Sequence, residues 1–91
     1  MNAQEKSLRR EARYFGETAA AHVGAALRFA IGAEQWRTIA AQCEGEDYAD
    51  ARELALKRAG EEDAHADRMV ERAVKATVRA IANANLSIGE R

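Results

Sequence analysis

Alanine recurs every seven residues along two long stretches of this chain. The series are Ala12, Ala19, Ala26, Ala33 and Ala40 in the first stretch and Ala59, Ala66, Ala73 and Ala80 in the second. A seven-residue repeat keeps its members on one face of an α-helix, and alanine has the highest helix propensity. The chain also has no proline, and no segment alternates with the period of two that is typical of a strand. The sequence therefore predicts an all-α fold of two long helices.

A second heptad series runs beside each row of alanines. These companion series are Leu8, Phe15, His22, Phe29, Trp36 and Cys43 in the first helix and Tyr48, Ala55, Glu62, Met69 and Ala76 in the second. Small residues beside large ones let facing helices approach closely. We expect Phe15, Phe29 and Trp36 to lie in the core. Gly16, Gly24 and Gly32 recur every eight residues, where they favour either close helix contact or a kink.

The boundaries predict one antiparallel helical hairpin over residues 1–91. The first helix is expected over about 4–43, the turn over 44–47, the second helix over about 48–84, and a mobile tail over 85–91. Gly45 is a suitable C-terminal stop, and Asp47 or Asp50 is a suitable N-cap for the second helix.

The apolar surface of the first helix is wider than one partner helix can cover. Val23, Leu27, Ala30 and Ile31 add a second edge to the heptad seam. A hairpin of this size buries only one stripe on each helix. We therefore expect a homodimer or higher homo-oligomer in which two chains form a four-helix bundle.

Composition argues against several classes of partner. The formal net charge is −1, from 14 basic and 15 acidic residues without long runs of one sign, so neither nucleic-acid binding nor a polybasic membrane anchor is expected. The longest uncharged stretch, residues 18–27, is too short to span a bilayer. The single cysteine, Cys43, excludes an internal disulfide. A charged N-terminus unlike a signal peptide predicts a cytoplasmic location.

The segment 61–65 carries the most informative chemistry. Glu62 falls on the alanine stripe of the second helix, and His65 follows one turn later on the same face. Glu-x-x-His is the spacing by which carboxylate bundles bind two metal ions, and pairing of two chains would present it twice. The first helix should supply a further carboxylate level with residues 28–32, and Glu34 is the nearest candidate.

Other roles fit these residues as well. Glu62 and His65 are alternatively a buried polar pair that sets the helix register, or a small shift in helical phase exposes them. His22, on the seam of the first helix, is interpreted as a core or interface histidine.

The chain resembles the encapsulated ferritins, which are short half-ferritins. The resemblance lies in Glu17, His22, Trp36 and the segment 61–66, and it covers most of residues 15–70. It implies a hairpin that dimerises into a ferritin-like four-helix bundle, with Glu62, His65 and a carboxylate of the first helix binding iron at the interface as a ferroxidase. The positions expected for that carboxylate hold Ile31 and Gly32 instead. Residues 85–89 resemble the tags that load cargo into encapsulin shells, which implies an encapsulin-type partner.

The leading hypothesis from sequence is thus a ferritin-like iron-binding protein. Its di-iron site would use Glu34, Glu62 and His65 and could oxidise ferrous iron. One alternative is a non-enzymatic helical-hairpin assembly or adaptor protein. Another is a ferritin-like relative that has kept its fold and lost its metal.

Overall fold

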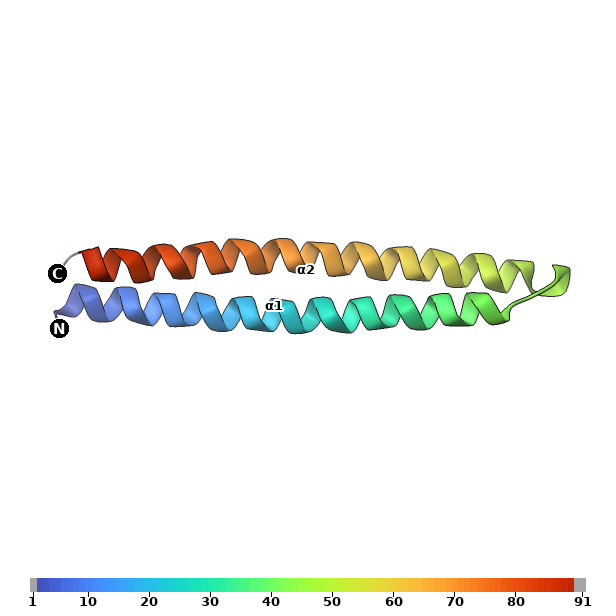
Figure 1. Cartoon of the computed structure of the whole chain (residues 1–91), viewed down its shortest axis with the longest axis horizontal. Coiled ribbons are helices and arrows are strands. Elements are labelled where there is room, and N and C mark those ends of the chain that lie inside the picture. Colours follow the sequence, from blue (N-terminus) through green and yellow to red (C-terminus); the bar gives the residue numbers. More distant parts are fainter. Residues whose placement is uncertain (1, 90–91) are drawn as a thin grey trace. The chain divides into compact units, whose positions relative to one another are not determined.

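Two helices and a short turn make up the chain (Figure 1). The structure is a computed structural model that describes residues 2–89, with the side chains of residues 2–86. Helix α1 spans Ala3–Gln42, the 3-10 helix η1 spans Glu46–Tyr48, and α2 spans Ala49–Gly89. No strand occurs among the described residues. The predicted all-α fold with a helical hairpin is confirmed.

Local chemistry explains the start of α1 and the turn. The Asn2 side-chain oxygen accepts a hydrogen bond from the Glu5 backbone N–H at 2.7 Å, which satisfies one of the free donors at the helix start. After α1 ends, Gly45 adopts a φ of 89°, a conformation that glycine reaches without steric cost. Gly45 was predicted as the C-terminal stop of the first helix, but α1 already ends at Gln42, and Gly45 is instead the N-cap position of η1 within the turn.

Two predicted boundaries of the second helix are wrong. Asp47 lies within η1 and Asp50 within the first turn of α2, so neither is its N-cap. Helix α2 also continues to Gly89 instead of ending at residue 84, because residues 85–89 contain no proline and the helix can propagate through them. Residues 90–91 of the predicted tail lie outside the described residues.

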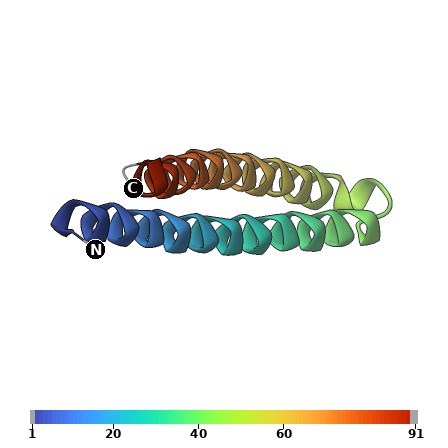
Figure 2. The ribbon, with the colours of Figure 1, turned by 60° about the vertical axis from the view of Figure 1, so that its left-hand side comes forward.

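The chain divides into two compact units. The turn unit, Gly24–Met69, is an antiparallel hairpin made from the end of α1, the turn and the start of α2 (Figures 1 and 2). The terminal unit combines Met1–Val23 with Val70–Arg91. Within it, Asn83 donates a hydrogen bond to Glu11 at 3.2 Å, which joins the two helix segments.

Every buried residue in the described part of the chain is an alanine. The turn unit buries Ala26, Ala33, Ala40, Ala55 and Ala59, and the terminal unit buries Ala19, Ala73 and Ala76. These positions confirm the predicted alanine seam. Phe15, Phe29 and Trp36, which were expected in the core, are only half-buried, because alanines fill the contact line and leave the rings at its rim.

Large apolar side chains are instead exposed. Those with 45% or more of their surface exposed are Tyr14, Val23, Leu27, Ile31, Ile39, Tyr48, Leu54, Leu56, Val70, Val74, Val78, Ile81 and Leu86. They are spread over both units. None of the described helices combines the length and hydropathy needed to cross a membrane.

Candidate functional site

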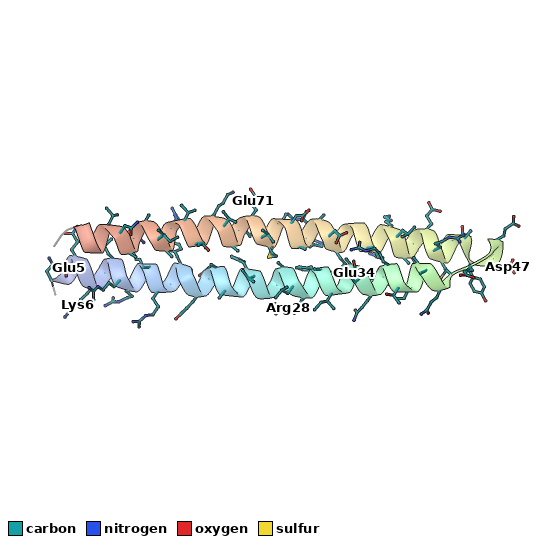
Figure 3. The ribbon with its side chains drawn as sticks, viewed as in Figure 1. Glu5, Lys6, Arg28, Glu34, Asp47 and Glu71 are labelled. Carbon is teal, nitrogen blue, oxygen red and sulfur yellow. The ribbon has the colours of Figure 1, made fainter. Side chains whose placement is uncertain are left out.

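The polar residues of the turn unit lie on two sides of its alanine seam. At 3.6 residues per turn, Gly32 and Arg37 project to opposite sides of the buried Ala33. On α2, Glu62 and Asp63 likewise project to opposite sides of the line through the buried Ala59. We call the side of Arg37 and Asp63 the ion-pair side, and that of Gly32 and Glu62 the ring side. Arg28 points away from α2 altogether (Figure 3).

Arg37 connects the helices on the ion-pair side. Its guanidinium donates to the Glu34 carboxylate at 2.6 and 2.9 Å and to the Asp63 carboxylate at 2.8 Å. These hydrogen bonds favour the charged form of each group, so they lower the pKa of Asp63 and raise the pKa of Arg37. About half of each of the Arg37 and Asp63 side chains is exposed, so solvent weakens the pair. The Glu34 carboxylate is therefore bound by Arg37 of its own helix, α1.

Glu62 lies on the ring side, close to Gly32 of α1. A Cβ atom built on Gly32 would lie 3.0 Å from Oε2 of Glu62. Such a distance means that a larger residue at position 32 would displace the carboxylate. The predicted close contact is therefore present at Gly32, whereas only Arg28 of the same helix lies near Gly24, and no side chain lies near Gly16.

His65 is held by two neighbours on the ring side. Its ring stacks on Phe29 with centroids 5.0 Å apart and planes 28° apart. Its Nδ1 also lies within hydrogen-bond distance of the Arg68 guanidinium, which can only donate. Nδ1 is therefore the acceptor, and Nε2 of a neutral ring carries the proton. In this arrangement neither ring nitrogen has a lone pair for a metal, so metal binding requires His65 to leave Arg68.

Glu34, Glu62 and His65 do not converge within one chain. Glu34 is engaged on the ion-pair side, whereas Glu62 and His65 lie on the ring side. Within the described part of the chain, no three His, Cys, Asp or Glu side chains form a group that could hold a metal ion. The predicted di-iron site needed a second chain, so it stays a prediction.

The terminal unit has a groove on one side of its seam. Arg79 lies over the Phe15 ring, 5.2 Å from its centroid, and this pair lies two heptads from the stacked pair of Phe29 and His65. The groove is lined by three basic side chains and several apolar ones: Tyr14, Phe15, Thr18, His22, Arg72, Val74, Lys75, Ala76, Val78 and Arg79. His22 is half-buried in this groove and does not lie in the alanine core, and its role at an interface stays a prediction.

Comparison with protein-family models, curated proteins and solved structures finds no match for this chain.

Arg37, Asp63 and Arg68 are among the interacting residues that sequence reasoning missed. A signal was available for two of them: Glu34 and Arg37 are three apart, as are His65 and Arg68, and this spacing brings side chains together on a helix. The link from Arg37 to Asp63 depends on how α1 and α2 pair, which spacing along one helix does not reveal.

Proposed function

We propose that this protein is a helical-hairpin assembly protein that pairs with a second copy of itself into a four-helix bundle. The observation that carries the proposal is the division between a core of alanines and a surface that exposes the large apolar side chains. Alanine burial removes little apolar area from water, and stability grows with that area. A second copy that covers the exposed residues supplies the missing burial.

The apolar residues favour the ion-pair side of the turn unit as part of the interface. Leu27 lies one heptad before Glu34, and Leu56 lies one heptad before Asp63, so both leucines share that side. They are 59% and 53% exposed. The charged groups of this side, Glu34, Arg37 and Asp63, are bonded to one another, which lowers the cost of covering them.

The terminal unit has a comparable apolar side. Val70 and Ile81 project to one side of the buried Ala73, and Arg72 and Arg79 project to the other. The two aliphatic side chains are each more than half exposed. Together they form an apolar stripe along one side of α2, and such a stripe on an amphipathic helix is suited to pack against another helix.

Two leucines provide a matched test of the proposed interface. Leu54 and Leu56 flank the buried Ala55 and are 51% and 53% exposed, but they project to opposite sides of the seam. We expect Leu56→Glu to raise the dimer dissociation constant by more than about tenfold, because it places an unpaired charge in an apolar interface. Leu54→Glu should leave the constant nearly unchanged. Light scattering over a dilution series measures both, and equal effects would contradict the proposed side.

Iron binding is the second candidate function, and the position of Glu62 favours it. The Glu62 carboxylate lies in the seam beside Gly32, with His65 one turn away on the same side. Two chains that met through their ring sides would bring together two carboxylates and two imidazoles, the donor types found in carboxylate-bridged iron bundles. This candidate predicts the reverse leucine result, with Leu54→Glu as the disruptive variant.

Anaerobic titration with Fe²⁺ tests the iron candidate directly. It predicts binding of about one ion per chain that is lost in His65→Ala. Arg68→Ala should tighten binding, because it frees Nδ1 of His65 and lets the ring present an unprotonated Nε2. Identical titrations for the wild type, His65→Ala and Arg68→Ala would argue against the candidate.

A further inference from the structure

The two compact units carry opposite charge. The terminal unit has eight Lys and Arg against five Asp and Glu, a formal charge of +3. The turn unit has six Lys and Arg against ten Asp and Glu, a formal charge of −4. The formal net charge of the whole chain, −1, is the sum of these two opposite charges. Any pairing of two copies must therefore bring either like or unlike charges together.

Both units present an apolar side beside these charges. In the turn unit, Leu27 and Leu56 share their side with Glu34, Asp63 and Arg37. Arg37 is already bonded to both carboxylates, and its single charge leaves one of theirs unbalanced. The side of the turn unit that exposes these leucines is therefore net acidic.

In the terminal unit, the apolar side carries the basic residue Arg13. Arg13 and Val23 project to the same side of the buried Ala19, and Phe15 projects to the other. Since Arg79 lies over Phe15, the valine side of α1 is also the side of Val70 on α2. A basic residue thus accompanies the exposed aliphatic side chains of this unit.

We propose that two copies pair in a crossed manner, with the terminal unit of each chain packed on the turn unit of the other. This inference rests on the proposed self-pairing and specifies its orientation. Crossed pairing sets +3 against −4 twice, whereas pairing of like units sets +3 against +3 and −4 against −4. Like charges brought together disfavour a complex and unlike charges favour it. The crossed arrangement is also isologous, because each chain uses the same two surfaces, so it closes as a dimer.

Distances between spin labels on two chains distinguish the arrangements. Lys57 in the turn unit and Ala82 in the terminal unit are exposed and project away from the seam. Lys57→Cys and Ala82→Cys, each in a Cys43→Ser background, give one labelling site per chain. Crossed pairing predicts the shortest interchain distance in mixed dimers that carry one label of each kind. Dimers that carry the same label twice should give longer distances.

The outcomes separate this inference from the self-pairing on which it rests. Dimers whose shortest distance joins two identical positions would overturn crossed pairing and leave self-pairing intact. A monomeric mass for the unlabelled wild-type chain would overturn both. As a second measurement, crossed pairing predicts a dissociation constant that rises with NaCl concentration, because salt screens the attraction between unlike units. A constant that falls with added NaCl would contradict the proposed electrostatic orientation.

Discussion

At the residue scale, Gly32 illustrates a contact that depends on having no side chain. A Cβ atom added at this position would lie 3.0 Å from Oε2 of Glu62, so the carboxylate would have to shift. The sequence pattern of glycines eight apart correctly indicated a close contact here. It also suggested contacts at Gly16 and Gly24, where no residue of α2 lies within 4 Å, because spacing along one helix does not reveal what faces it.

Alanine substitutions measure this contact. Gly60 has no side chain near its built Cβ position, so Gly60→Ala should stabilise the protein by roughly 1 kcal/mol through helix propensity alone. Gly32→Ala gains the same propensity but must displace the Glu62 carboxylate, so its net gain in free energy of unfolding should be smaller. Urea unfolding of both variants checks this difference. Equal gains would show that Glu62 does not press on position 32.

Asp63 predicts a pH dependence of stability. Hydrogen bonds from Arg37 lower its pKa in the folded state below the unfolded value. The pair therefore contributes stability above the unfolded pKa of about 4, and the contribution is lost as pH falls through the folded pKa. Asp63→Asn should flatten the decline in free energy of unfolding below about pH 4. Urea unfolding at a series of pH values below about 4 measures this decline, with Glu53→Gln as the control variant. A decline in Asp63→Asn as steep as that of the wild type would contradict the stabilising role of the pair of Arg37 and Asp63.

At the scale of the helices, heptad spacing predicted which positions are buried more accurately than local signals predicted where each helix ends. The alanine rows identified the contact line correctly, since Ala33 and Ala59 are fully or almost fully buried. The end of α2 was predicted at about residue 84, but the helix continues to Gly89, because the asparagine at position 85 only weakens a helix. The place of His65 was predicted on the seam, but packing against Phe29 leaves it exposed at the rim.

The alanine seam itself can be tested by adding volume. Ala33 has no exposed surface, so Ala33→Leu forces the helices of the turn unit apart and should cost about 1–3 kcal/mol of stability. Ala64→Leu is the matched control, because Ala64 is exposed on α2 and has room for the larger side chain. Thermal unfolding followed by ellipticity compares the two. Similar melting temperatures for both variants would show that the seam is not tightly packed.

At the scale of the whole molecule, the distribution of apolar residues matters more than any single contact. Heptad spacing indicated where alanines would gather, and it placed Val23, Leu27 and Ile31 on a surface too wide for one partner helix to cover, where they are indeed exposed. It could not reveal that the aromatic side chains of the seam stay at its rim, because that depends on how closely the alanine rows approach. Since only alanines are buried among the described residues, we expect folding and pairing to be coupled.

Sedimentation equilibrium on the wild-type chain, with melting curves at the same concentrations, tests the central claim most directly. Self-pairing predicts a mass of twice the 10.0 kDa chain and a melting temperature that rises with protein concentration. A helical, cooperatively melting species that stays at 10.0 kDa at every concentration, with an unchanging melting temperature, would contradict it.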